Sequence, residues 1–347
     1  MEVFWHEADL GIDLKKTICI LFCIFLTPLS GVSHHAFSGI FDMSNLIELE
    51  GQITRLLWRN PHVKFTMLDT NDQLWEIETN SVSILSRMNV SSDLLAEGDR
   101  VTVAGYPARS GVNEMWVNNI LLADGRELVT RPGTNPYWSV ESLGESETWL
   151  SAGVEGGEDL GIFRVWSTRF NGPGRYMYLE EYPLTETAIA AQEAFNPLVD
   201  NPIGECTPKG MPWIMQQPYP VKFSKEGDNI LFHIEEYDLV RTIHMGEEQI
   251  EASIQPALLG YSVGSWDGED LVVSTHSVDW YYFNSDGIPQ SSRARFEERF
   301  SLSENGVNLD YTIIVSDPET FTEPVKMTKQ WVWRAGETVN PYVCTNF

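Results

Sequence analysis

Four polar side chains in the second half of the chain have the types used in acid and base catalysis: His233, Glu235, Arg241 and His276. In the segment ILFHIEEY, His233 and Glu235 are two residues apart and would share one face of a strand. If that face lines a barrel interior, the low dielectric can separate the pKa values of imidazole and carboxyl, as proton transfer requires. Arg241 would then hold an anionic group or pair with Glu235. The alternative is that these residues face solvent or form structural ion pairs.

Aromatic residues gather near the same region, in and before THSVDWYYF. Trp266, Trp280 and Tyr282 could line an apolar pocket or support a sugar ring. Arg299, with His276 and either Glu297 or Glu298, would add a polar group. Packing in the core explains the aromatic residues equally well. The sequence contains no HExxH and no phosphate-binding glycine loop.

A second candidate chemistry is metal binding by the paired histidines of GVSHHAFS, His34 and His35. If the chain is cleaved after Ser33, His34 presents a free amine and an imidazole that can chelate one metal ion. His35 or His62 would add another nitrogen. Such ligands suit copper, nickel or zinc, and we take copper as the candidate. The alternative is a frayed terminus, with His62 capping a turn.

The segment before these histidines, KKTICILFCIFLTPLSGVS, has the pattern of a secretory signal peptide. A basic start precedes an apolar run over residues 18–29, and small residues precede the expected cleavage site. The run is too short for a transmembrane helix, which needs about 20 residues. We therefore expect residues 1–33 to be a signal peptide and the protein to be periplasmic or secreted, with no stable membrane anchor after cleavage.

Composition limits the partners of the exported chain. The formal net charge of the full sequence is −27, and such a surface repels polyanions, so nucleic acid and anionic membranes are poor partners. Beyond the leader only Cys206 and Cys344 remain. In an oxidising compartment they could form one disulfide, and the alternative is two unrelated buried thiols.

Strand patterns dominate the chain and form two blocks. In the first block, over residues 34–128, three strands, a helix and two more strands are separated by turn-rich segments. This is the order of a five-stranded OB-type barrel. Trp58, Trp75 and Trp116 could stack on bases, but basic residues are sparse between them, so we interpret them as packing residues. The expected strands are residues 46–58, 62–68, 73–79, 99–107 and 114–123, with a helix over 81–88.

The second block follows an acidic, glycine-rich linker over residues 129–160. Residues 161–347 contain a ladder of about eight alternating segments joined by hairpin-type turns. Successive antiparallel strands of this kind favour a closed, lipocalin-like barrel or a strongly curved sheet, because closure removes exposed edges. The fold class is therefore all-β, with an N-terminal OB-like barrel and a C-terminal antiparallel barrel or curved sheet.

Several motifs of the first block resemble a family of small secreted bacterial proteins of unknown function. They are HHAF, WRNPHV at Trp58, GDRVTVAGYPARSG at Gly98 and NNILLADGRE at Asn118. The second block, with GSWDGEDLVVST, EERF, VSDPETFTEP and PYVC, is similar to another exported bacterial family that is also uncharacterised. These resemblances imply export and β architecture and supply no activity.

Three functions are consistent with these patterns. The first is binding of a small, partly apolar ligand inside the C-terminal barrel. The second is an enzyme that uses His233, Glu235, Arg241 and His276 for acid and base chemistry there. The third is a periplasmic copper module built on His34.

Overall fold

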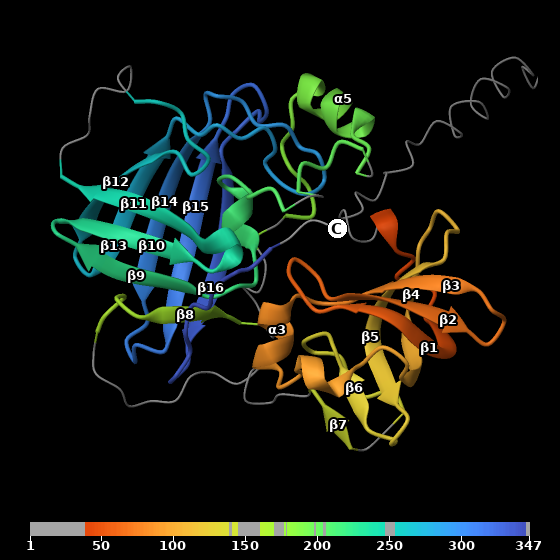
Figure 1. Ribbon diagram of the computed structural model, residues 1–347. Coiled ribbons are helices and arrows are strands. Elements are labelled where there is room, and N and C mark those ends of the chain that lie inside the picture. Colours follow the sequence, from red (N-terminus) through yellow and green to blue (C-terminus); the bar gives the residue numbers. More distant parts are fainter. Residues whose placement is uncertain are drawn as a thin grey trace, which may run out of the picture. The chain divides into compact units, whose positions relative to one another are not determined.

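The computed structural model describes residues 39–138, 141–144, 160–169, 177, 179–197, 199–203, 206–246 and 254–344 (Figure 1). All of them belong to one compact unit, His34–Phe347. The expected signal peptide lies outside the described residues. Within the described residues, no helix is both long and apolar enough to cross a membrane.

The first barrel has the strand order β3-β2-β1-β4-β5, and a parallel pairing of β3 with β5 closes it. The predicted five strands and the helix are confirmed, and the connectivity is that of an OB barrel. The elements are β1 (Ile47–Leu57), β2 (Lys64–Asp69), β3 (Leu74–Glu78), α3 (Val82–Arg87), η1 (Ser92–Leu94), β4 (Arg100–Pro107) and β5 (Glu114–Leu122).

Three local features shape this barrel. The register of β1 against β2 shifts between Ile53 and Arg55, a β-bulge that bends the long strand. At Gly105 a Cβ would lie 2.2 Å from the carbonyl oxygen of Trp116, so only glycine allows the close approach of β4 to β5. Ser81 caps α3 by accepting a hydrogen bond from the backbone N–H of Ile84 at 3.2 Å.

The sheet of the first barrel extends further than the sequence indicated. β6 (Glu127–Val129) pairs with β5, and β7 (Ser142–Leu143) pairs with β6, so part of the expected 129–160 linker belongs to the sheet. The buried Glu127 carboxylate explains this, because it accepts hydrogen bonds from the backbone N–H groups of Tyr137 and Trp138 at 2.6 and 2.8 Å. A charged side chain thus ties the connecting segment to the barrel.

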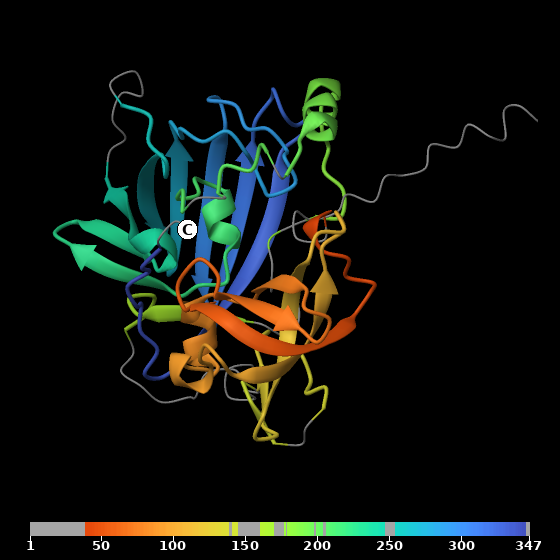
Figure 2. The same cartoon turned by 45° about the vertical axis from the view of Figure 1, so that its right-hand side comes forward.

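The second barrel is closed and has nine strands in the order β10-β11-β12-β13-β14-β15-β16-β8-β9 (Figures 1 and 2). The eight expected segments are all strands, and β8 completes the ring. Its elements are β8 (Val165–Thr168), α5 (Glu186–Ala194), η2 (Trp213–Gln216), β9 (Val221–Glu226), β10 (Asn229–Ile234), η3 (Glu236–Asp238), β11 (Leu239–Met245), β12 (Tyr261–Asp267), β13 (Asp270–His276), β14 (Arg295–Leu302), β15 (Asn308–Ser316) and β16 (Val325–Trp333).

One pairing differs from the antiparallel ladder that we expected. β11 and β12 are parallel, with Ile243 opposite Ser262. A parallel pair cannot be joined by a tight hairpin. The connection here is the long segment between Met245 and Tyr261, which the sequence pattern did not distinguish from a loop between antiparallel strands.

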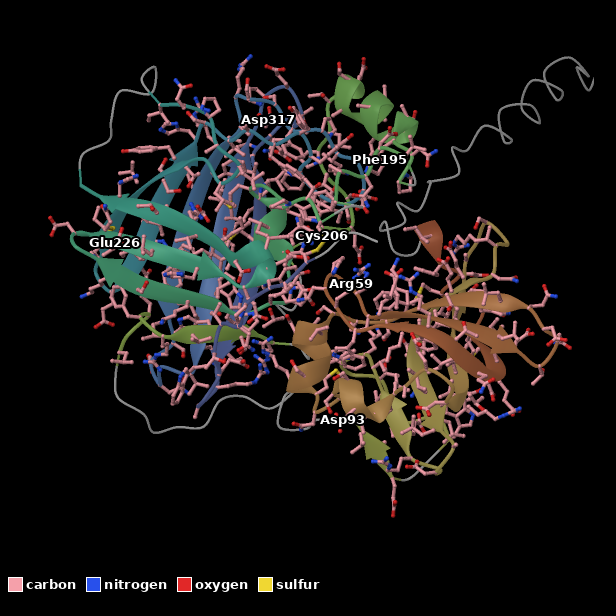
Figure 3. All side chains as sticks on the ribbon, in the orientation of Figure 1. Arg59, Asp93, Phe195, Cys206, Glu226 and Asp317 are labelled. Carbon is pink, nitrogen blue, oxygen red and sulfur yellow. A yellow bond between two sulfur atoms is a disulfide. The ribbon has the colours of Figure 1, made fainter. Side chains whose placement is uncertain are left out.

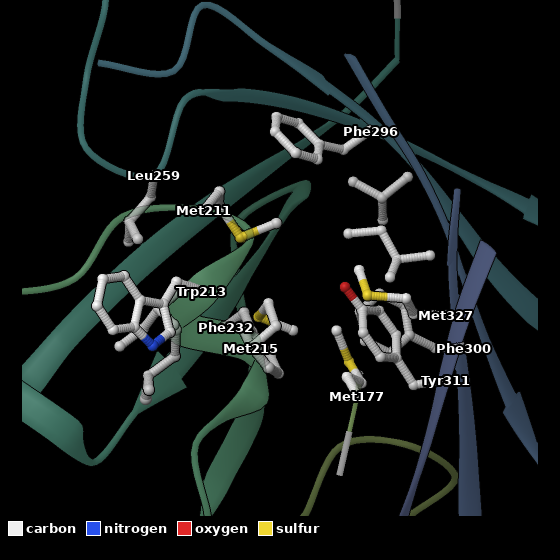
Figure 4. Close-up of a cluster of buried hydrophobic side chains, with 14 of the residues drawn as sticks. Met177, Met211, Trp213, Met215, Phe232, Leu259, Phe296, Phe300, Tyr311 and Met327 are labelled. Carbon is white, nitrogen blue, oxygen red and sulfur yellow. The ribbon is translucent and has the colours of Figure 1, made fainter. Parts of the chain in front are cut away.

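Large apolar side chains cluster inside the second barrel (Figure 4). Phe232, Phe296 and Phe300 are completely buried, and the rings of Phe300 and Tyr311 lie 4.8 Å apart. Trp213, from η2, belongs to the same apolar cluster as these strand residues. Each such side chain contributes about 1.5–3 kcal/mol on burial. The inward face therefore carries an apolar core, and ligand binding in the lumen stays a prediction.

Candidate functional site

The structure does not bring the four expected catalytic residues together. His233 lies on the outer face of β10, because the buried positions of that strand are Ile230, Phe232 and Ile234. Its Nε2 is hydrogen-bonded to the hydroxyl of Ser224 at 2.9 Å. The assumption that the face bearing His233 lines the interior is therefore wrong.

Glu235 and Arg241 are both buried, but each pairs with another residue. Arg87 of α3 donates to both carboxylate oxygens of Glu235. Arg241 pairs inside the barrel with Glu298, which also accepts a hydrogen bond from the Tyr311 hydroxyl at 2.6 Å. The proposed pairing of Arg241 with Glu235 is wrong, because Glu235 follows the end of β10 and no longer continues the alternation of that strand.

His276 and the expected ligand-binding residues are also dispersed. The Nδ1 atom of His276, a buried residue, is hydrogen-bonded to the Ser277 hydroxyl at 2.8 Å. Trp266 is 45 % exposed, whereas Trp280 is buried against Trp213. The ring of Tyr282 packs against that of Phe195. Arg299 donates hydrogen bonds to the carboxylates of Asp267 and Asp270.

The predicted disulfide between Cys206 and Cys344 is present, with the Cα atoms 5.8 Å apart (Figure 3). It joins two points 138 residues apart in the sequence. Cys344 also forms a parallel bridge with Asn60 of the first barrel. The C-terminal segment is therefore held against both halves of the chain.

Beside this disulfide lies a cavity of about 770 Å³, which we call the inter-barrel cavity. Both halves of the chain contribute to its wall, and the residues of that wall combine paired charges with aromatic rings. They are Ile40, Pro61, His62, Lys64, Glu78, Asn80, Ile84, Asn201, Ile203, Cys206, Lys209, Gln217, Pro218, Tyr219, Glu236, Tyr237 and Tyr342.

One wall of the cavity carries a histidine–carboxylate pair. Nδ1 of His62 is bonded to Oε1 of Glu78, and Nζ of Lys64 lies 3.0 Å from the other Glu78 oxygen. Lys64 and Glu78 are cross-strand partners on β2 and β3. Burial opposes ionisation of Glu78, but attraction to His62 and Lys64 prevails and lowers its pKa to about 2. The carboxylate is therefore ionised at neutral pH.

The opposite wall carries Glu236, which is buried. Nζ of Lys209 donates to Oε1 of Glu236 at 2.6 Å and to Gln217 at 2.8 Å. Burial raises the pKa of Glu236 against the attraction of Lys209. Its Oε2 atom is buried and has no hydrogen-bond partner within the part of the chain that the structure describes. Buried carboxylate oxygens in native proteins are nearly always hydrogen-bonded, so this oxygen of the cavity wall is a candidate ligand-binding atom.

The backbone that places Glu236 is unusual. Tyr237 and Asp238 both have positive φ, at 60° and 52°. Non-glycine residues seldom adopt this conformation, and it concentrates at functional sites. The carboxylate of Asp238 accepts a hydrogen bond from the backbone N–H of Tyr342 at 2.9 Å, which holds the turn against the C-terminal segment.

Three tyrosines complete the wall. The ring of Tyr342 lies 5.3 Å from that of Tyr219 and 5.1 Å from that of Tyr237. Burial raises the pKa of all three phenols, so they remain neutral hydrogen-bonding groups at physiological pH. Tyr219 and Tyr342 also pack on the core of the first barrel. The wall is therefore built on fixed elements of both halves.

Residues 24–116 match a family of unknown function, DUF6152. The match covers His62 and Glu78 but none of the cavity residues of the second half. It agrees with the resemblance of the first block to an uncharacterised family, whereas the resemblance of the second block stays a prediction. No curated protein matches the chain.

Metal binding at the N-terminus stays a prediction, because His34 and His35 lie outside the described residues. In the described ranges, no group of three or more histidine, cysteine, aspartate or glutamate side chains is placed to hold a metal ion. His62, the third expected ligand, is bonded to Glu78 instead. The sequence analysis did not identify Glu78, Lys209, Glu236 or the three tyrosines of the cavity wall as site residues. Only the NPH triplet and the EEY segment pointed to the inter-barrel cavity.

Proposed function

We propose that this chain is an exported protein that binds a small, partly apolar molecule in the inter-barrel cavity. The observation that carries the proposal is the cavity itself, whose volume of about 770 Å³ lies in the range of ligand pockets, about 300–1,000 Å³. Apolar and aromatic surface comes from Ile84, Ile203 and the three tyrosines, and a few fixed polar groups would orient the ligand.

The charge of the chain agrees with a ligand of low charge. The whole sequence carries −27, but the charges of the cavity wall occur as the pairs Lys64–Glu78 and Lys209–Glu236. A locally balanced wall favours neither a strongly anionic nor a strongly cationic ligand.

The test is native mass spectrometry of protein purified from its source, with a variant that fills the cavity. We expect a retained small molecule in the unmodified protein and its loss in Ile203→Trp. Val240→Trp is the matched control, because Val240 is 48 % exposed on β11 and lies outside the cavity wall. Retention of the molecule by Ile203→Trp, or its absence from the unmodified protein, would contradict the proposal. Sequencing the mature N-terminus of the same sample tests export, for which we expect a start at His34.

A further inference from the structure

The bond between His62 and Glu78 fixes the state of the imidazole. Glu78 is ionised at neutral pH and can only accept a hydrogen bond, so Nδ1 of neutral His62 must carry the proton. Nε2 then carries the free lone pair. A carboxylate at Nδ1 also stabilises the imidazolium that forms when Nε2 takes up a second proton.

His62 is also accessible from the cavity and held in a fixed orientation. Its side chain is 39 % exposed and lines the cavity, so a molecule in the cavity can reach it. Its ring packs edge-on against Trp116, with the ring centres 5.2 Å apart and the planes at 85°. Two independent contacts, to Glu78 and to Trp116, therefore hold the plane of the base.

The second wall provides an acid for the same molecule. Glu236 and His62 line the same cavity. Burial raises the pKa of the Glu236 carboxyl, so it holds its proton to a higher pH than an exposed glutamate does. When Glu236 loses its proton, Nζ of Lys209, at 2.6 Å, stabilises the resulting carboxylate.

We propose that the inter-barrel cavity is a proton-transfer site for a carbonyl compound with an acidic C–H next to the carbonyl. Nε2 of His62 takes the proton from that carbon, and the C–H electron pair forms the carbon–carbon double bond of an enol. The carbonyl π pair moves to oxygen, which receives the proton of the Glu236 carboxyl. His62 ends as imidazolium and Glu236 as carboxylate, and reversal at the same carbon restores both. Glu78 is a positioning residue that touches His62 alone.

This inference rests on the proposed function, and a simple probe tests it. Cyclohexanone in D2O exchanges its α-protons for deuterium whenever a base removes them, and NMR spectroscopy follows both the exchange and the binding of the probe. We expect the full chain to accelerate exchange and His62→Phe to lose about 100-fold of that rate, the typical contribution of a general base. Glu236→Gln should also slow exchange, because the amide cannot donate an acidic proton.

Further variants separate chemistry from structure. Glu78→Gln should keep probe affinity but lower the exchange rate, because the amide no longer fixes the Nδ1–H tautomer, whereas a collapsed site would lose both. His244→Phe is the matched control, since His244 stacks on Tyr261 at 4.7 Å and lies outside the cavity wall. His62→Gln serves if His62→Phe fails to fold.

The outcomes distinguish the two proposals. Binding of the probe with equal exchange rates in the unmodified protein and His62→Phe overturns the proton-transfer role and leaves ligand binding intact. Failure of the probe to bind, together with no retained molecule in the native protein, overturns both. Failure of the probe to bind while a native molecule is retained overturns the carbonyl class proposed here.

Discussion

Arg87 binds Glu235 through two parallel hydrogen bonds, from its two terminal nitrogens to the two carboxylate oxygens, at 2.7 and 2.6 Å. The pair joins α3 of the first barrel to the residue that follows β10 of the second. Nε of Arg87 also donates to Glu337 at 2.8 Å, and Glu235 accepts from the backbone N–H of Asn340 at 2.9 Å. One buried guanidinium thus connects the two halves and the C-terminal segment that flanks the cavity.

Replacing Arg87 should therefore destabilise the protein strongly. Arg87→Met leaves the Glu235 carboxylate buried without its partner, and we expect a loss of about 3–5 kcal/mol in the free energy of unfolding. Urea denaturation measures the loss. Arg293→Ala is the control, because Arg293 and Glu319 form an exposed pair at 3.4 Å whose removal should cost less than about 1 kcal/mol. Similar losses in both variants would contradict this role of Arg87.

The pair inside the second barrel gives a different prediction. Arg241→Met should cost about 3–5 kcal/mol, because Glu298 would remain buried and uncompensated. The double variant Arg241→Met/Glu298→Leu should recover most of that loss, since a matched apolar pair of similar volume avoids the desolvation of both charges. Thermal unfolding of the single and double variants measures how much stability the second substitution recovers. A double variant as unstable as the single one would mean that the network with Tyr311 is required for packing.

Both ion pairs show what the sequence could and could not predict. The five strands of the first barrel and all strands of the second except β8 were predictable, because alternation of polar and apolar residues is a local signal. The partners of Arg87 and Arg241 were not, since Glu235 lies 148 residues from Arg87 and Glu298 lies 57 residues from Arg241. Alternation also fails where a strand ends, which is why Glu235 does not share a face with His233.

The candidate site also depends on contacts between residues that are not neighbours in the sequence. His62 and Glu78 meet across a hairpin, and Lys209 and Glu236 meet across a gap of 27 residues that includes η2, β9 and β10. The parallel pairing of β11 and β12 leaves no mark in a single sequence. The disulfide was predictable because only two cysteines remained to be paired, so no choice of partner was involved.

Removing the disulfide should open the cavity. The double variant Cys206→Ser/Cys344→Ser releases a crosslink between positions 138 residues apart, and we expect a loss of about 2–5 kcal/mol in stability. Because Cys206 and Tyr342 lie in or beside the cavity wall, ligand affinity should fall more than it does in Arg293→Ala. Denaturation and native mass spectrometry of both variants provide the comparison, and unchanged ligand retention would show that the crosslink does not support the site.

The His62–Glu78 pair predicts an acid-sensitive contribution to stability. The pKa of Glu78 is lowered from 4.5 to about 2, so its contribution is complete above about pH 4.5 and is lost as pH falls toward 2. Its size should be on the order of 2 kcal/mol. Glu78→Gln should therefore show a flatter decline of stability between pH 5 and 2, measured by urea denaturation at each pH. Parallel declines in the two proteins would contradict the pairing.

Lys329 predicts a second rise of stability with pH, in the alkaline range. Its ammonium is buried and bonded only to the carbonyl oxygens of Met215 and Gln217 among the described residues, at 3.1 and 2.5 Å. Burial outweighs the attraction of Glu236 and lowers the pKa of Lys329 from 10.5 to about 7. Between these two values the unfolded chain binds a proton that the folded protein has released, so stability should rise with pH from about 7 to 10. Lys329→Met should remove this rise, as urea denaturation across that range would reveal, whereas Lys326→Met, at an exposed position of the same strand, should keep it. A rise that persists in Lys329→Met would show that another group releases the proton.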